Sequence, residues 1–234
     1  MSAPRESFAA SDPRGGIASR GSSFLAVVSR MRYIDRWALM RSSRAENLAE
    51  HSLDVAMIAH MLCVLGRVRH GRDLDADRAA LIGLYHDSSE IITGDMPTPV
   101  KYHDPAILDA YKAVEAGAER RLLDTLPDDI RPVYEQVFAA ADSDEDENGA
   151  YLRRLVKAAD KISALIKCVD ELRAGNREFE SAEATCRSAV DELAAELPEV
   201  ADFVARLGAV DPRLAGVRVA EVAPSLFQLE AAGA

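Results

Sequence analysis

The sequence predicts an all-α helical bundle that forms a single domain. Apolar residues recur at helical spacings of three, four and seven, no alternating strand pattern runs for more than a few residues, and no internal repeat is visible. The 234 residues suffice for one sizeable hydrophobic core. We expect residues 1–22 to be a disordered tail, residues 23–205 to form the domain, and residues 206–234 to be a partly ordered C-terminal extension.

The helices are predicted from apolar stripes and from the residues that end them. The first stripe is typical of an amphipathic helix and consists of Leu48, Val55, Ile58, Leu62 and Leu65. The remaining predicted helices end at glycines, prolines or acidic turns. These helices are Asp77–Ile92, Pro105–Leu126, Tyr151–Gly175 and Glu178–Leu197.

Composition and charge exclude several classes of partner. The net charge is −11, which argues against binding to a nucleic acid polymer or an anionic membrane. No run of 18 apolar residues occurs, so no membrane-spanning helix is predicted. The three cysteines are isolated and form no CxxC pair, so neither a disulfide framework nor a thiolate zinc cluster is indicated. We expect a cytoplasmic protein.

An acidic run from Asp142 to Glu147 resembles the start of a calcium-binding loop. The EF-hand pattern requires Gly at its sixth place and Glu at its twelfth, where this chain has Glu147 and Arg153. We therefore interpret the run as a solvated connection.

A different set of residues has the pattern of a metal site. His51 lies on the apolar stripe of the first predicted helix, where a lone histidine is most often a core residue bonded to a backbone carbonyl. His86 and Asp87 are adjacent in the second predicted helix, and Glu90 follows on the same helical face. Asp160 lies at the margin of an apolar face, where an acid is costly unless it is paired or ligating.

Two imidazoles and two carboxylates are a reasonable ligand set for a divalent metal. Histidine favours zinc, manganese, cobalt or iron(II) over magnesium. Four protein ligands leave coordination positions for water and a substrate oxygen, and such a metal activates water near neutral pH. Glu90 would then be a carboxylate able to handle protons beside the metal.

The sequence around these residues resembles a known family. The words "EHSLDVA", "YHDSSE" and "KAADKI" resemble the H…HD…D signature of HD-domain phosphohydrolases. The longer words "DRWALMR", "ENLAEHSL", "YHDSSEIITGDMPTPVKY" and "ELRAGNREF" are similar, in the same order, to the bacterial 5′-deoxynucleotidases of that superfamily. The resemblance extends from Phe24 to about Leu197.

This resemblance implies an HD-domain helical bundle, a homodimer, and hydrolysis of deoxyribonucleoside 5′-monophosphates to deoxynucleoside and phosphate. It implies metal ligation by His51, His86, Asp87 and Asp160, with cobalt, manganese, zinc or iron as the expected ion. It makes Glu90 and Arg36 the catalytic residues, Arg36 by orienting the phosphate. The residues implied to contact substrate are Arg36, Trp37, His51, Asp87, Asp95, Met96, Pro97, Thr98 and Asp160.

Elementary chemistry agrees with these roles and leaves some open. The planar guanidinium of Arg36 suits phosphate oxygens, and Trp37 is a candidate wall against a ribose 2′-hydroxyl. Asp95 is either a sugar-hydroxyl acceptor or an Asx-turn residue of the loop. Lys101 could reach phosphate, but a lysine on a loop is usually solvated, and we expect it to lie outside the site. Three other histidines, predicted to be structural or exposed, are His60, His70 and His103.

Two other functions remain open from the sequence. One is an HD-domain hydrolase of another phosphoester, such as a cyclic nucleotide or a guanosine polyphosphate. The other is a noncatalytic helical module that senses a nucleotide. The closeness of "DRW" and "GDMPTPVKY" to the deoxynucleotidases argues against the first, and the intact ligand set with Glu90 argues against the second.

Overall fold

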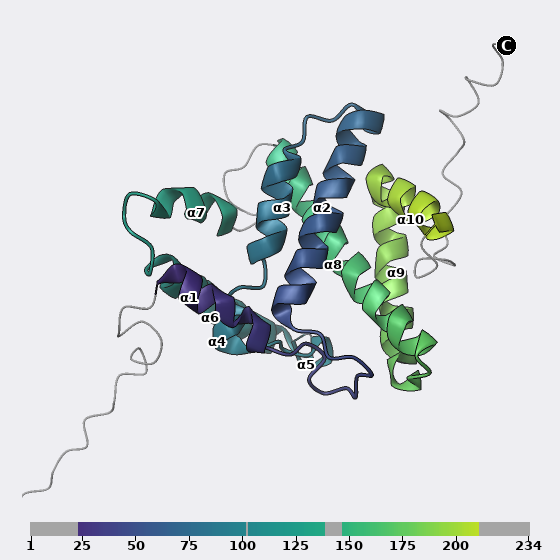
Figure 1. The fold of residues 1–234 in the computed structure, drawn as a ribbon, viewed down its shortest axis with the longest axis horizontal. Coiled ribbons are helices and arrows are strands. Elements are labelled where there is room, and N and C mark those ends of the chain that lie inside the picture. The colour runs from purple at the N-terminus through teal and green to yellow at the C-terminus, as the bar shows by residue number, and fades with distance from the viewer. Residues whose placement is uncertain (1–22, 102, 139–146, 211–234) are drawn as a thin grey trace, which may run out of the picture.

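A long helix, α2 (Leu48–His70), stands at the centre of the computed structural model (Figure 1). The structure describes residues 23–101, 103–138 and 147–210, and within these ranges all regular secondary structure is helical. The all-α prediction is therefore confirmed. The other elements are α1 (Phe24–Val28), the 3-10 helix η2 (Ser29–Tyr33), α3 (Ala76–Tyr85), α4 (Glu90–Thr93), α5 (Thr98–Lys101), α6 (Pro105–Leu123), α7 (Arg131–Phe138), α8 (Glu147–Arg173), the 3-10 helix η3 (Arg177–Phe179), α9 (Glu180–Glu196) and α10 (Pro198–Val210).

Local sequence explains where α2 begins and ends. The Asn47 side-chain oxygen accepts the backbone N–H groups of Ala49 and Glu50, and Gly71 ends the helix in the left-handed conformation at φ 63°. By length and hydropathy α2 is the one described helix that could cross a membrane, but 44% of its most apolar window is buried inside the protein. It packs against α3 and α8, as expected of a core helix.

The main hydrophobic core lies between α2, α3, α8, α9 and α10. Helices α2 and α3 cross closely because Gly83 has no side chain: a Cβ there would lie 2.8 Å from Ala56 Cα. His51 lies on α2 and His86 caps the end of α3. The close crossing therefore brings the two histidine-bearing segments together.

A second apolar cluster holds α1 and η2 against the start of α2 and against α4 and α6. Ile91 belongs to this cluster, so its packing fixes the segment that carries Glu90. His51 lies one turn from Leu48 of this cluster and one turn from Val55 of the main core. The candidate site thus lies where the two cores meet. The buried members of the second cluster are Phe24, Val27, Met31, Leu48, Ile91, Leu122 and Leu126.

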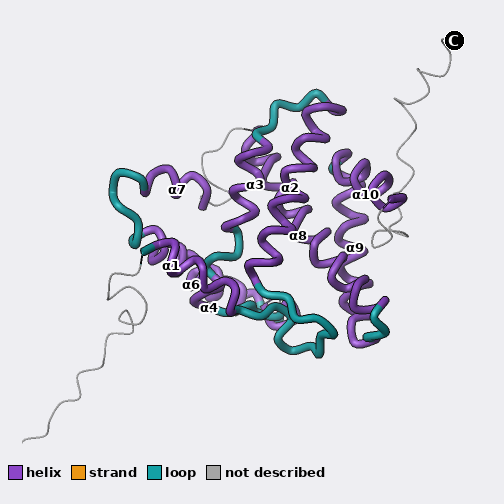
Figure 2. Tube along the Cα trace, in the orientation of Figure 1, coloured by secondary structure: helices purple, strands orange, loops and turns teal. Residues whose placement is uncertain are grey.

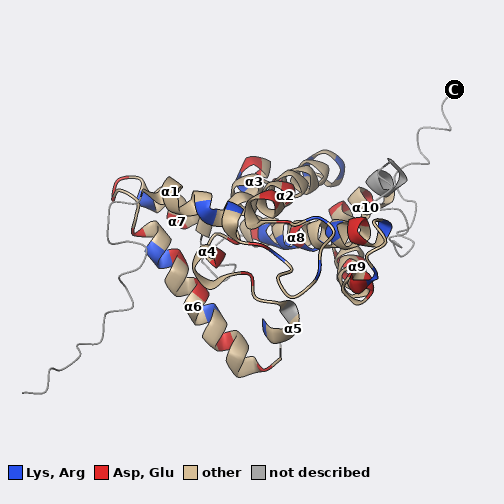
Figure 3. Ribbon diagram, turned by 60° about the horizontal axis from the view of Figure 1, so that its bottom comes forward, with Lys and Arg blue, Asp and Glu red and all other residues tan. Residues whose placement is uncertain are grey.

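The loop between η2 and α2, residues 34–47, reaches the C-terminal end of α8 (Figure 2). There the Glu171 carboxylate accepts the backbone N–H groups of Ser43 at 2.7 Å and Arg44 at 3.3 Å. Asn176 Nδ2 donates to the Arg41 carbonyl at 2.6 Å. Figure 3 shows Lys and Arg interspersed with Asp and Glu along α6 and α8.

One predicted helix is wrong in an informative way. The expected helix Asp77–Ile92 is divided, because α3 ends at Tyr85 and α4 begins at Glu90. In the turn between them, the Ser88 hydroxyl donates to the Tyr85 carbonyl at 2.7 Å, and His86 Nδ1 donates to the Gly83 carbonyl at 2.8 Å. These side chains take carbonyls that a continuous helix would use for backbone bonds.

The other boundaries differ less from the predictions. Helices α6 and α8 end three and two residues before Leu126 and Gly175, respectively, and α9 is preceded by the turn η3. Residue 205 lies within α10, which continues to Val210. Residues 1–22 and 211–234, and most of the acidic run from Asp142, lie outside the described residues.

Candidate metal centre and nucleotide site

His51 is fully buried on α2, and a contact of its Nδ1 atom orients the ring. Nδ1 lies 3.1 Å from the Ser163 hydroxyl of α8. Nε2 lies 3.2 Å from Asp160 Oδ1 and 3.5 Å from Asp87 Oδ2, and it makes no hydrogen bond. The ring therefore presents an unpaired nitrogen to two carboxylates.

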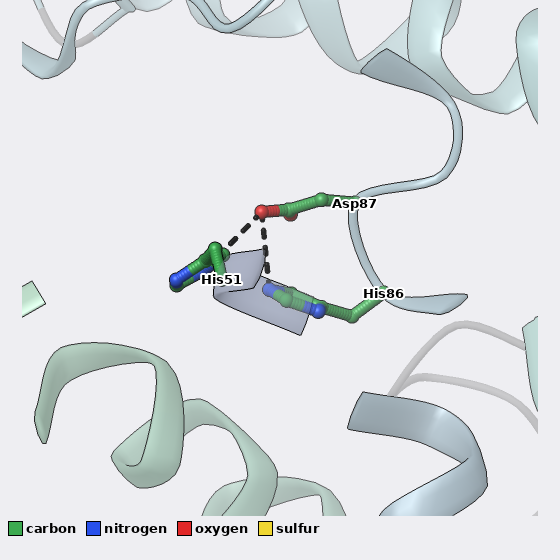
Figure 4. A group of neighbouring side chains, drawn as sticks. All are labelled: His51, His86 and Asp87. Carbon is green, nitrogen blue, oxygen red and sulfur yellow. Dashed lines mark ion pairs between the residues drawn. The ribbon is translucent and has the colours of Figure 1, made fainter. Parts of the chain in front are cut away.

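His86 presents its Nε2 to the same point. Its Nδ1 carries a proton, because it donates to the Gly83 carbonyl, so in the neutral ring the lone pair lies on Nε2. Nε2 is buried without a hydrogen bond and lies 3.1 Å from Asp87 Oδ2. The ligand atoms of His51, His86 and Asp87 lie within 4.8 Å of one another (Figure 4).

Asp160 comes from α8 and joins the group through His51. Its second oxygen, Oδ2, accepts from Lys161 Nζ at 2.9 Å. The structure thus brings the four predicted ligands together from α2, α8 and the turn after α3. Two unpaired, buried imidazole nitrogens that face two carboxylates are a donor set that fits a divalent metal.

Electrostatics within the group favour opposite charges on His86 and Asp87. Burial alone would lower the pKa of His86, but the Asp87 carboxylate, with help from Asp160, raises the pKa to about 9. The same contact lowers the pKa of Asp87 to about 2 despite its burial. A bound cation would replace the imidazolium proton, because ligating histidine must be neutral.

Glu90 lies beside the group in the first turn of α4. Its side chain is buried, and Oε2 has no hydrogen-bond partner. Burial first, and then the charges of Asp87 and Asp95, raise the pKa of Glu90 to about 9. The continuous helix expected here is wrong, yet the Glu90 N–H donates to the Asp87 carbonyl at 3.0 Å and the acid stays next to the cluster.

Arg36 and Trp37 lie in the loop before α2. Arg36 Nη1 pairs with Glu46 Oε1 at 2.9 Å. Burial opposes its charge, but the surrounding acids Glu46, Asp160, Asp87 and Asp95, in that order, raise the pKa of Arg36. Trp37 has φ 60°, a left-handed conformation that is uncommon for an aromatic residue and is typical of functional sites.

The loop expected to line the nucleotide is joined to Trp37. Asp95 Oδ2 accepts the Trp37 backbone N–H at 3.0 Å, so this oxygen bonds across to another loop and not within its own turn. Met96 and Pro97 are partly buried, and Thr98 begins α5. The Thr98 side chain lies outside the described part of the structure.

The structure shows the surroundings of the four residues that were left out of the predicted site. His60 is 46% exposed and lies 3.9 Å from Asp77, and His70 lies 3.4 Å from Asp202. His103 is exposed. Lys101 was expected to be solvated, but Nζ pairs with Glu115 at 2.9 Å and lies over the Tyr111 ring.

Three functional candidates were missed from the sequence: Glu46, Ser163 and Glu171. Glu46 contacts Arg36, Trp37 and His51, Ser163 orients His51, and Glu171 anchors the loop that carries Arg36 and Trp37. Glu46 and Glu171 lie within "ENLAEHSL" and "ELRAGNREF", the words that carry the family resemblance. That location was the available signal, because acids at these places otherwise look solvated.

The fold is that of the HD-domain phosphohydrolases. An HD-domain phosphohydrolase from Listeria innocua superposes with a TM-score of 0.68 at 22% identity, over 82% of this chain and 87% of that one. The protein PH0347 from Pyrococcus horikoshii superposes with a TM-score of 0.60 at 19% identity, over 81% of this chain and 98% of that one.

Sequence similarity narrows this class to one family. Residues 23–209 match the family described as 5′-deoxynucleotidase YfbR-like, and the chain belongs to it. A 5′-deoxynucleotidase from Vibrio cholerae is 47% identical over 161 residues, which are 69% of this chain and 80% of that one. The 5′-deoxynucleotidase YfbR of Salmonella newport is 46% identical over 158 residues, 68% of this chain and 77% of that one. The resemblance identified from the sequence motifs is confirmed.

Proposed function

We infer that this protein is a metal-dependent 5′-deoxynucleotidase, which hydrolyses deoxyribonucleoside 5′-monophosphates to deoxynucleoside and phosphate. The observation that carries this conclusion is the group of two imidazoles and two carboxylates around the buried His51, with Glu90 beside it, in a chain of the YfbR-like family. Such a group, next to an arginine, has the parts that phosphate-ester hydrolysis needs.

We propose that His51, His86, Asp87 and Asp160 hold the metal, with cobalt, manganese, zinc or iron(II) as the ion. The unpaired Nε2 atoms of both histidines support this ligand set, and imidazole ligands favour these ions over magnesium. When bound, the metal would supply water activation and positive charge for the phosphate oxygens. His51, Asp87 and Asp160 would thereby also border the bound phosphate.

Arg36 and Glu90 have complementary roles in the proposed reaction. Arg36 Nε is buried without a hydrogen-bond partner, so this N–H is available to a nonbridging phosphate oxygen. In the metal-free protein, burial and the neighbouring acids raise the pKa of Glu90 to about 9, so this carboxyl favours its protonated form. The protonated carboxyl can donate to the 5′ oxygen of the leaving deoxynucleoside.

Trp37 and the segment Asp95–Thr98 are proposed to bind the nucleoside. The bond between Asp95 and the Trp37 backbone joins these two segments into one wall. A rigid indole near C2′ would exclude a ribose hydroxyl by overpacking. This wall is our candidate for the preference for deoxyribose.

A substrate panel tests the proposed function. Phosphate release is measured from deoxy- and ribonucleoside 5′-monophosphates, a cyclic nucleotide and a guanosine polyphosphate, with EDTA or with added manganese or cobalt. We expect metal-dependent release from the deoxynucleoside monophosphates and little from the others. Release only from the cyclic or polyphosphate substrate would assign another HD-domain activity, and no release from any substrate would indicate a nucleotide sensor.

We further propose that the protein works as a cytoplasmic homodimer and does not act on nucleic acid polymers or membranes. The net charge of −11 argues against binding to nucleic acid polymers and anionic membranes, and the homodimer is the state that the family resemblance implies. The cysteines at 63, 168 and 186 are free thiols, in keeping with a reducing compartment.

A further inference from the structure

The Glu46 carboxylate faces three functional side chains at once. Oε1 lies 2.9 Å from Arg36 Nη1 and 3.5 Å from His51 Nδ1, and Oε2 accepts the Trp37 indole N–H at 3.2 Å. None of the proposed roles for metal, phosphate or nucleoside includes Glu46. Its contacts nevertheless include both Arg36, which is proposed to bind the phosphate, and Trp37, which is proposed to bind the sugar.

Backbone hydrogen bonds bring Arg36 and Glu46 together independently of their side chains. The Arg36 N–H donates to the Glu46 carbonyl at 2.9 Å, and Asp35 and Asn47 form an isolated antiparallel bridge. This short pairing places Arg36 directly opposite Glu46. Asn47 then caps α2, which fixes Glu46 relative to the helix that carries His51.

Burial makes the Arg36–Glu46 pair directional. The two side chains are 11% and 13% exposed, so water competes only weakly for the pair. Because Glu46 engages Nη1, the guanidinium plane is held while Nε has no protein partner. The other carboxylate oxygen fixes the rotamer of Trp37, whose ring packs 5.4 Å from the Phe179 ring.

His51 depends on Glu46 much less. The His51 Nδ1 hydrogen bond goes to Ser163 at 3.1 Å, whereas Glu46 Oε1 lies farther away at 3.5 Å. Removal of Glu46 should therefore leave the metal-binding nitrogen of His51 in place. A Glu46 variant should therefore change the binding of substrate without changing the binding of metal.

We propose that Glu46 is a positioning residue that holds Arg36 for the phosphate and Trp37 for the sugar, so that one carboxylate sets both catalytic efficiency and deoxyribose selectivity. The proposal rests on the function proposed above. It adds a residue whose loss should change selectivity as well as rate.

The first test uses the indole as its own reporter, because Trp37 is the only tryptophan in the chain. Emission spectra are compared for metal-free wild type, Glu46→Gln and Glu46→Ala, with Glu50→Ala as the control. Glu50 is exposed on the first turn of α2 and lies outside the site. We expect both Glu46 variants to shift the emission maximum and the control to match wild type. An unshifted spectrum in both Glu46 variants would overturn the proposal.

The second test measures kcat and KM of the manganese-loaded proteins with deoxyadenosine and adenosine 5′-monophosphates. Glu46→Ala should lower kcat/KM for the deoxynucleotide about 10- to 100-fold and narrow the deoxy-to-ribo ratio about 10-fold. Glu46→Gln, which keeps the shape and one oxygen acceptor, should fall between wild type and Glu46→Ala. If Glu46→Ala does not fold, the Glu46→Gln variant alone provides the comparison with wild type.

A double variant separates positioning from a general structural effect. If Glu46 acts through Arg36, then Arg36→Ala with Glu46→Ala should lose little more deoxynucleotide kcat/KM than Arg36→Ala alone. Additive losses, an unchanged deoxy-to-ribo ratio, or loss of bound metal in Glu46→Gln would each contradict the proposal. Absence of phosphate release by the wild type would refute the underlying function as well, which is a distinguishable result.

Discussion

At the scale of single residues, the most unusual group is the Glu90 carboxyl. It is buried, it has an unpaired oxygen, and burial together with Asp87 and Asp95 raises its pKa to about 9. In the metal-free protein this acid favours its protonated form at neutral pH, and a protonated carboxyl suits the donation of a proton to a leaving oxygen. The same environment costs stability whenever that proton is lost.

Stability of the metal-free protein should therefore fall as pH rises. Between the unfolded pKa of 4.5 and the folded value near 9, the folded state keeps a proton that the unfolded state releases, so rising pH favours unfolding. Glu90→Gln removes this titration and should be more stable than wild type by about 1 kcal/mol or more at pH 8. Urea unfolding in EDTA at pH 5 and pH 8 measures the difference. Glu50→Gln, an exposed control, should follow wild type, and identical pH dependence of Glu90→Gln and wild type would contradict the account.

At the scale of elements, the loop of residues 34–47 owes its position to the end of α8. Glu171 is buried there, where it accepts bonds from Lys167, Asn176 and the Ser43 backbone. Burial opposes its charge, but these donors hold the pKa of Glu171 well below its usual range. One carboxylate thus holds the Ser43–Arg44 part of a loop that has little regular structure.

Glu171→Ala should release this loop while the bundle stays folded. Loss of a charged acceptor for two partly buried backbone N–H groups should cost about 1–3 kcal/mol, and amide hydrogen exchange should accelerate in residues 38–46. The neighbouring Asp170 is exposed, so Asp170→Ala is the matched control and should exchange as wild type does. Unchanged protection of the loop in Glu171→Ala would show that other contacts hold it.

At the scale of the whole molecule, one face of the central helix is both apolar and exposed. Leu53, Met57 and Met61 follow each other at four-residue spacing on α2 and are 53%, 55% and 42% exposed. A two-fold axis along this stripe would bring the same apolar face of each copy together. We propose this face as the contact of the homodimer.

Met57→Glu should then weaken the dimer, because like charges would meet at the axis. Light scattering coupled to size exclusion should give a dimer for wild type and a smaller mass for Met57→Glu. Val133→Glu on α7 adds the same charge at a site that is 62% exposed, and it should remain dimeric. A monomeric wild type, or a Met57→Glu variant that stays dimeric, would exclude this contact.

Sequence reasoning succeeded where local signals agree across the whole molecule. The apolar stripe of α2 predicts that helix, and His51 and Asp160 stood out because they lie on or beside apolar faces. The helix expected at Asp77–Ile92 was wrong because side-chain bonds of His86 and Ser88 end it early.

Other features depend on tertiary contacts that no local pattern encodes. Helix α7, for example, was not predicted, and none of its residues is fully buried. Ser163 contacts His51 from a segment far away in the sequence, and Glu46 contacts it from the loop before α2, so helical periodicity carries no signal for either contact.

The most direct test of the central claim compares bound metal with turnover in three proteins: wild type, His51→Ala and Glu90→Gln. We predict about one metal per wild-type chain, loss of that metal in His51→Ala, and retained metal in Glu90→Gln with turnover of a deoxynucleoside 5′-monophosphate about 10²- to 10⁴-fold lower. Full metal content in His51→Ala, or undiminished turnover in Glu90→Gln, would contradict the assignment of ligand and proton donor.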